Sequence, residues 1–140
     1  MAQQIKKVVL VHGAFADGSG WAPVASILKN NGYKVSVPQP PETSYADDQK
    51  YTKAAIDAMG GPVVLVGHSY GGSIITEAGN HPNVAALVYI AAFALDEGAS
   101  PNRAAGTAFP AASFERRLAA TSVITALFFY RCRIATRDVR

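Results

Sequence analysis

The sequence has little cysteine and little charge. Cys132 is the only cysteine among 140 residues, so the chain cannot form an internal disulfide. This excludes a small secreted domain held together by disulfides and fits a reducing compartment, so we expect a cytoplasmic location. Only 16% of the residues are charged, whereas 49% are hydrophobic. Such a composition excludes a disordered chain and predicts a soluble globular domain with a real core.

Lysine is absent after residue 53, and arginine is absent before residue 103. Residues 1–102 carry six lysines against eight acidic residues, a net charge of −2. Residues 103–140 carry seven arginines against two acidic residues, a net charge of +5, which gives the chain its total of +3. The basic character therefore belongs to the last segment alone. It does not form the basic face with interleaved aromatics that nucleic-acid binding requires, so we expect no nucleic-acid partner.

Long hydrophobic runs are also absent. The apolar residues near the start, Val8–Val11, are too few for the core of a signal peptide. The run Leu118–Tyr130 is flanked by arginines and is much shorter than the ~20 residues that a membrane-spanning helix needs. We expect no membrane association.

The sequence also lacks the common cofactor and metal motifs. It contains no G-x-x-x-x-G-K-[ST] and no G-x-G-x-x-G between a strand and a helix. The three histidines, His12, His68 and His81, do not have the spacing of metal ligands. No metal and no cofactor are therefore expected.

What is present is an alternation of strand and helix patterns from residue 5 to residue 91. The expected strands are Ile5–Val11, Tyr33–Val37, Val63–Val66 and Val84–Ala91. The expected helices are Trp21–Asn31, Ala46–Met59 and Gly72–Asn80. The third and fourth strands are apolar at every position, as in strands that are covered on both faces. Strict alternation predicts an α/β fold with a parallel sheet flanked by helices and right-handed crossovers.

For the first two helices the sequence also predicts how they begin or end and which face is buried. Ser19 is expected to cap the first helix, and Gly60–Gly61 to end the second. The apolar face of the second helix is assigned to its small and aromatic residues. These residues are Tyr51, Ala54, Ala55 and Ala58.

The strongest chemical signal is Gly67-His68-Ser69-Tyr70-Gly71, a G-x-S-x-G. The pattern alone is weak, but here a buried strand leads into it and a helix follows. This is the setting of a nucleophile elbow, in which the serine sits on a strained strand-to-helix turn. Gly67 and Gly71 are then required because a β-carbon at either position would clash with neighbouring backbone.

A second loop supports the first. His12-Gly13-Ala14-Phe15 directly follows the first strand and can aim a backbone N–H at an oxyanion. The other donor would be the backbone N–H of Tyr70, the residue after the nucleophile. The order of strand, His-Gly loop, elbow and helix makes the combined signal specific.

These motifs resemble those of the α/β-hydrolase superfamily, in particular small esterases related to plant methylesterases and hydroxynitrile lyases. The likeness rests on VVLVHGAFADGSGW, PVVLVGHSYGG and LVYIAAFALDEG, and it covers about residues 4–102. It implies that Ser69 is the nucleophile and that the amides of Ala14 and Tyr70 form the oxyanion hole. His12, Gly13 and Phe15 would shape the loop and the pocket.

The chain departs from that family after residue 102. The family places an acid and a histidine base after later strands, in the order Ser, Asp/Glu, His. We therefore divide the chain into a partial α/β-hydrolase domain (1–102) and an atypical Arg-rich tail (103–140), expected to come from a truncated or frame-shifted gene. The tail is expected to pack without completing the sheet. Asp96 follows the fourth strand but lacks a histidine to orient, so we interpret Asp96 and Glu97 as a solvated loop.

No histidine of this chain is a good general base on sequence grounds. His68 adjoins Ser69 and should point away from it, and His12 belongs to the oxyanion loop. His81 lies ~18 Å along the following helix. The expected activity is hydrolysis of small carboxylic esters through an acyl-enzyme at Ser69, impaired here because the acid and base are missing. Cyanohydrin cleavage and a catalytically dead, ligand-binding fragment remain alternatives, and the oligomeric state is left open.

Overall fold

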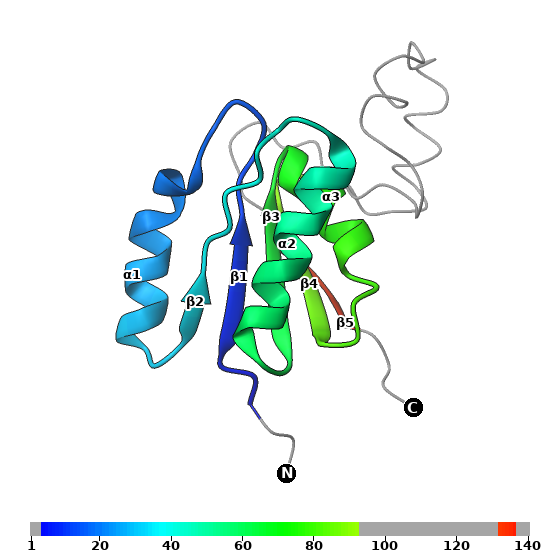
Figure 1. Ribbon diagram of the computed structural model, residues 1–140. Coiled ribbons are helices and arrows are strands. Elements are labelled where there is room, and N and C mark those ends of the chain that lie inside the picture. Colours follow the sequence, from blue (N-terminus) through cyan, green and yellow to red (C-terminus); the bar gives the residue numbers. More distant parts are fainter. Residues whose placement is uncertain (1–3, 93–131, 137–140) are drawn as a thin grey trace, which may run out of the picture.

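The computed structural model describes residues 4–92 and 132–136, which form one sheet with helices on both faces (Figure 1). The strands are β1 (Lys7–Val11), β2 (Lys34–Ser36), β3 (Val63–His68), β4 (Val84–Ile90) and β5 (Cys132–Thr136). The helices are a 3-10 turn, η1 (Gly18–Trp21), followed by α1 (Ala22–Asn30), α2 (Tyr45–Met59) and α3 (Tyr70–Ala78). The expected α/β fold is confirmed, with each element from β1 to β4 close to its expected position.

The strand order in the sheet is β2-β1-β3-β4-β5. The first four strands are parallel, with Val9 beside Leu65 at the centre and Leu65 beside Leu87. Because parallel strands end at the same edge, the loops that follow β1 and β3 are neighbours in space although α1, β2 and α2 separate them in sequence. This order brings the His-Gly loop and the G-x-S-x-G motif together.

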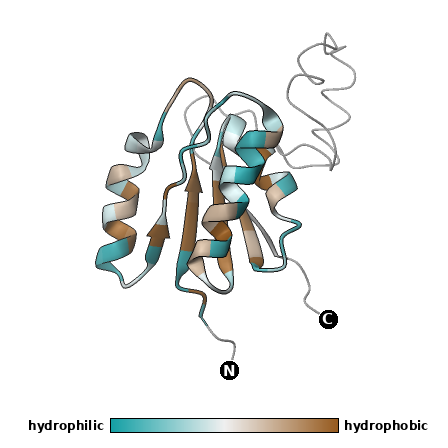
Figure 2. Cartoon of the chain, viewed as in Figure 1, coloured by the Kyte–Doolittle hydropathy of each residue, from teal (hydrophilic) through white to brown (hydrophobic). Residues whose placement is uncertain are grey.

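The core lies on both faces of the sheet. Alternate residues of β1 serve opposite faces: Val9 and Val11 pack with the buried residues of α2 and α3, whereas Val8 and Leu10 pack with Trp21 and Ala25. β1, β3 and β4 are the most uniformly hydrophobic elements, whereas the helices carry many polar residues (Figure 2). The apolar strand runs in the sequence are therefore explained by coverage on two sides.

Of the two expectations about helix ends, the one for the end of α2 is confirmed and the one for the start of α1 is wrong. Gly60 ends α2 in the left-handed conformation at φ 63°, as expected for a glycine after a helix. Ser19 does not cap the first helix. It lies inside η1, and the Asp17 side chain accepts the hydrogen bond from the Ser19 backbone N–H instead. A carboxylate two residues earlier reaches this N–H because the chain enters through a 3-10 turn rather than directly into α1.

The buried face of α2 is also different from the one expected. Asp48, Thr52, Ile56 and Met59 are buried, whereas Tyr51 is 53% exposed. The sequence pattern was misleading because two buried positions are polar. Both are hydrogen-bonded: the Thr52 hydroxyl donates to the Asp48 carbonyl, and the Asp48 carboxylate accepts from Glu42 and Tyr70. Satisfied polar groups can be buried at little cost.

The tail contributes a fifth strand at the edge of the sheet. The expectation that it packs without completing the sheet stays a prediction, because most of the tail lies outside the described residues. β5 pairs antiparallel with β4, from Ala86 beside Thr136 to Ile90 beside Cys132. The edge of β4 offers unpaired N–H and C=O groups, and such an edge accepts any extended segment that reaches it. Among the described strands, β4 is the last one in the parallel order. The acidic residues Asp96 and Glu97 and the rest of the tail lie outside the described residues.

Candidate active site

Backbone strain is concentrated at one edge of the sheet. Within residues 4–92, the non-glycine residues with positive φ are Phe15, Glu42, Ser69 and Ala91. Each of them follows one of the four parallel strands, so they lie in the loops at the carboxyl edge. Left-handed backbone costs a non-glycine residue roughly 1–3 kcal/mol and persists where the surrounding structure enforces it, most often at functional sites. This edge is also where open α/β sheets bind ligands.

Ser69 occupies the strained turn between β3 and α3. Its backbone angles are φ 52° and ψ −121°, and it forms the N-cap of α3. The Ser69 N–H donates to the Ile90 carbonyl (3.3 Å), and the Ser69 carbonyl accepts from the Gly72 N–H (3.0 Å). These bonds fix the turn from β4 on one side and from α3 on the other. The expected strand-to-helix turn with unusual backbone angles is confirmed.

The two glycines of the motif have no room for a side chain. A β-carbon on Gly67 would lie 2.6 Å from the Gly71 carbonyl oxygen. A β-carbon on Gly71 would lie 2.6 Å from the carbonyl oxygens of both Val11 and His12. These contacts involve backbone, which cannot move aside, so the clash expected from the sequence is confirmed. They also show that α3 begins directly against the end of β1.

The loop after β1 lies against the serine. A β-carbon on Gly13 would come within 3.1 Å of the Ser69 β-carbon, so the loop passes close to the nucleophile candidate. Ala14 is exposed, and Phe15 is fully exposed at φ 60°. The loop after β1 and the serine turn are therefore neighbours in the structure.

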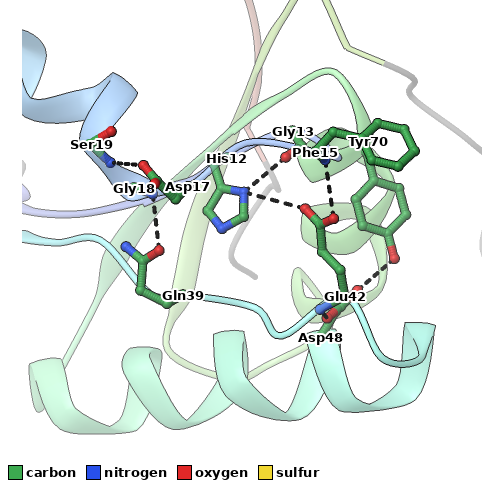
Figure 3. A network of polar contacts seen from close by, with 10 residues as sticks. All are labelled: His12, Gly13, Phe15, Asp17, Gly18, Ser19, Gln39, Glu42, Asp48 and Tyr70. Carbon is green, nitrogen blue, oxygen red and sulfur yellow. Dashed lines mark hydrogen bonds and ion pairs between the residues drawn. The ribbon is translucent and has the colours of Figure 1, made fainter.

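His12 is buried and turned back onto its own loop. Its Nδ1 lies 2.8 Å from the Gly13 carbonyl oxygen, which can only accept, so Nδ1–H donates (Figure 3). The same nitrogen lies 3.8 Å from a carboxylate oxygen of Glu42. His12 thus bonds to the backbone of its own loop.

His68 and His81 have other partners. The His68 ring packs edge-on against Trp21, with centroids 6.5 Å apart. The His81 Nδ1 accepts from the Asn83 N–H (3.2 Å), which leaves its Nε2–H to donate to the Asp57 carboxylate (2.9 Å). Both ring nitrogens of His81 are therefore engaged, and its partner belongs to α2 rather than to the serine turn.

Two acidic residues of this region were missed by sequence reasoning. Glu42, in the loop after β2, accepts from the Phe15 N–H through Oε2 (3.1 Å). Asp48, only 1% exposed, accepts from the Glu42 N–H (2.8 Å) and from the Tyr70 hydroxyl (2.7 Å). The signal that could have revealed Asp48 is its spacing to Thr52, Ile56 and Met59, which places it on the buried face of α2.

The tyrosines beside this network have shifted pKa values. Burial, followed by the hydrogen bond to the Asp48 carboxylate, raises the pKa of Tyr70 well above its ordinary value. Burial also raises the pKa of Tyr45, whose hydroxyl donates to the Ser73 carbonyl. Both side chains are therefore neutral donors at physiological pH, and Tyr70 is a fixed link between the start of α3 and α2.

Neither a metal-binding cluster nor a membrane-spanning helix occurs in the described part of the chain. Residues 4–92 contain no group of three or more His, Cys, Asp or Glu side chains placed to hold a metal ion. None of α1, α2 and α3 has the length and apolar character required to cross a bilayer.

Comparison with known proteins identifies relatives of this fold and motif. Over 110 residues the chain is 32% identical to the pyrethroid hydrolase of Sphingobium wenxiniae, covering 69% of this chain and 39% of that protein. It is also 32% identical over 106 residues to the carbendazim hydrolyzing esterase of a Nocardioides species, covering 66% of this chain and 44% of that protein. The chain thus spans about two fifths of the length of these curated relatives.

A solved structure supports the same relationship. An extracellular α/β-hydrolase from a Paenibacillus species, described as homologous in structure and function to tobacco Salicylic Acid Binding Protein 2, superposes with a TM-score of 0.62 at 26% identity. The alignment covers 83% of this chain and 52% of that structure. The family model of the alpha/beta hydrolases matches residues 8–138, continuing past residue 102, where the likeness identified from the sequence ends. Because this match covers most of the sequence, the chain belongs to the alpha/beta hydrolase family.

Proposed function

We propose that the chain carries the nucleophile and the oxyanion-binding half of a serine esterase. The Ser69 hydroxyl would attack the carbonyl carbon of a small ester, the alcohol would leave, and water would release the acid from the acyl-enzyme. The observation that carries this proposal is the strained Ser69 turn, packed against the loop after β1. The names of both curated relatives describe hydrolases, which favours hydrolysis over cyanohydrin cleavage.

The oxyanion of the tetrahedral intermediate would be bound by the backbone N–H groups of Ala14 and Tyr70. Tyr70 is the first residue of α3, so its N–H has no acceptor within the helix and lies at the positive end of the helix dipole. Ala14 belongs to the loop that passes against Ser69. Donors fixed before the reaction stabilise developing charge without reorganising, and each is worth on the order of 10²–10³ in rate.

We expect Ser69 to receive little general-base assistance in this 140-residue chain. All three histidines of the sequence lie within the described residues. His12 is bonded to Gly13, and His81 is bonded to Asp57 and Asn83. General-base catalysis contributes about 10²–10⁴ in rate. We therefore propose an esterase whose Ser69 reacts slowly in this chain taken by itself.

Covalent labelling tests this proposal directly. The purified 140-residue chain is treated with an aryl phosphonate, which phosphonylates activated serines, and the modified residue is located by mass spectrometry. We expect slow stoichiometric labelling of Ser69 that is abolished in Ser69→Ala and unchanged in Ser26→Ala, an exposed serine on α1. Turnover of a short-chain aryl ester should show the same dependence. A chain that is folded by circular dichroism but not labelled would contradict the proposal and favour a ligand-binding role.

A further inference from the structure

Two carboxylates join the loops that follow β1, β2 and β3. Glu42 lies in the loop after β2, and its left-handed backbone, at φ 55°, turns its side chain toward the loop after β1 (Figure 3). Asp48 lies on α2 directly beneath it, and its second oxygen binds the hydroxyl of Tyr70 at the start of α3. A continuous polar path therefore runs from Phe15 through Glu42 and Asp48 to Tyr70.

At one end of this path the orientation of Ala14 is fixed. The Ala14 N–H shares a planar peptide unit with the Gly13 carbonyl, so the two groups point in opposite directions. His12 Nδ1–H holds the Gly13 carbonyl at 2.8 Å, which sets the direction of the Ala14 N–H. Glu42 Oε2 holds the next peptide through the Phe15 N–H at 3.1 Å, and Oε1 lies 3.8 Å from the His12 Nδ1. Both peptides that flank Ala14 are thus held, and Glu42 contacts both anchors.

At the other end the path reaches Tyr70. Asp48 is almost completely buried, and a carboxylate removed from water needs partners for its oxygens. Its Oδ1 accepts the Glu42 N–H at 2.8 Å, and its Oδ2 accepts the Tyr70 hydroxyl at 2.7 Å. The strained backbone of Glu42 and the first residue of α3 are therefore tied to the same carboxylate.

We infer that Glu42 and Asp48 are positioning residues that set the distance and orientation between the Ala14 and Tyr70 amides. This inference rests on the proposed function, because it assigns those amides to one oxyanion. Neither carboxylate touches the substrate. Glu42 acts through the loop after β1, and Asp48 acts through Glu42 and the Tyr70 side chain.

The test compares Glu42→Ala with Glu42→Gln. Glutamine keeps a carbonyl oxygen for the Phe15 N–H, whereas alanine removes the acceptor. With an aryl phosphonate, we expect the maximal rate of Ser69 labelling to fall about tenfold in Glu42→Ala, while the concentration for half-maximal rate changes less than twofold. Glu42→Gln should recover at least a third of the original rate. Asp47→Asn is the matched control, since Asp47 is exposed and its side chain binds only Thr43 and Ser44 among the described residues.

Amide resonances separate failure of this inference from failure of the proposed function. In nitrogen–proton NMR spectra, Glu42→Ala should shift the Ala14 and Tyr70 amides and accelerate exchange of the Phe15 amide, while Glu42→Gln and Asp47→Asn should not. These shifts support the positioning role even if the unmodified chain is not labelled at Ser69, a result that defeats only the proposed esterase. Unchanged Ala14 and Tyr70 resonances, or unchanged labelling in Glu42→Ala, would overturn the inference even where Ser69 is labelled.

Discussion

Gly13 and Ser69, far apart in sequence, lie so close that a β-carbon on Gly13 would approach the Ser69 β-carbon to 3.1 Å and the His68 Nδ1 to 3.3 Å. The loop after β1 therefore has no spare volume beside the serine. This contact defines the first prediction, because it can be changed by a single methyl group.

Gly13→Ala should displace the loop from Ser69 by a few tenths of an ångström. We expect a loss of stability of about 1–3 kcal/mol, since the added methyl group overpacks a crowded site. Labelling of Ser69 by a phosphonate should slow on the order of tenfold because the oxyanion donors move with the loop. Gly20→Ala is the control, since a β-carbon there meets nothing within 4 Å. Labelling of Gly13→Ala at the original rate would show that the loop plays no part.

Tyr70→Phe should change the alkaline stability of the protein. The pKa of Tyr70 is raised in the folded state, so its contribution to stability is complete below the ordinary tyrosine pKa of ~10 and is lost as pH rises above it. When measured by urea unfolding, the free energy of unfolding should decline between pH 8 and 11, and this decline should be smaller in Tyr70→Phe. Some decline should remain, because the pKa of Tyr45 is raised as well.

At pH 8 the free energy of unfolding of Tyr70→Phe should be lower by about 1–3 kcal/mol, since the substitution leaves a buried oxygen of Asp48 without its donor. Tyr51→Phe, at an exposed position on α2, serves as the control and should follow the unmodified protein. Parallel pH profiles for Tyr70→Phe and the unmodified protein would contradict the assignment.

Ser44→Ala should destabilise α2 at its N-terminus. The Ser44 hydroxyl oxygen accepts from the Asp47 N–H at 3.1 Å, which satisfies one of the helix's free donors. Loss of such a cap costs about 1 kcal/mol, measurable as a lower urea midpoint with an unchanged slope. Ser26→Ala, at an exposed position inside α1, should not lower the midpoint because alanine favours a helix interior. Equal effects of the two substitutions would argue against the cap.

His81→Gln should leave Ser69 labelling within twofold of the original rate. Both ring nitrogens of His81 are occupied by Asn83 and Asp57, so it is not available as a base. The measurement is the phosphonate labelling rate at neutral pH, with Ser69→Ala as the zero reference. A loss of more than tenfold in a folded His81→Gln variant would mean that His81 reaches the serine after all.

The parallel strands and the serine turn could be predicted because their signals are local. Val63–Val66 is apolar throughout, and Gly67 and Gly71 frame the serine at a fixed spacing. Each signal depends on one segment and on backbone sterics. The parallel arrangement of the strands then follows from general rules for alternating strands and helices, whereas their order in the sheet does not.

What escaped prediction depends on contacts between segments. Asp48 is buried only because Glu42 and Tyr70 supply donors from two other elements, so its sequence neighbourhood looks like an exposed helix face. Ser19 does not cap α1 because the chain first turns through η1, which Asp17 caps, and α1 then begins after Trp21 without a side-chain cap. β5 forms because the edge of β4 is open, a property of the assembled sheet rather than of residues 132–136. The cytoplasmic location and the truncated origin of the tail stay predictions.

The strand order also has a consequence for biosynthesis. β1 pairs with β3 as well as with β2, so the loop after β1 leaves the ribosome long before the turn that it must contact. During that interval β1 can pair only with β2, and its other edge stays unpaired until β3 has been translated. Pairing between such distant segments requires closing a large loop first, which makes it slow relative to the local helices. Ser69 should therefore acquire its reactive environment as one of the last events of folding, when β3 docks between β1 and β4.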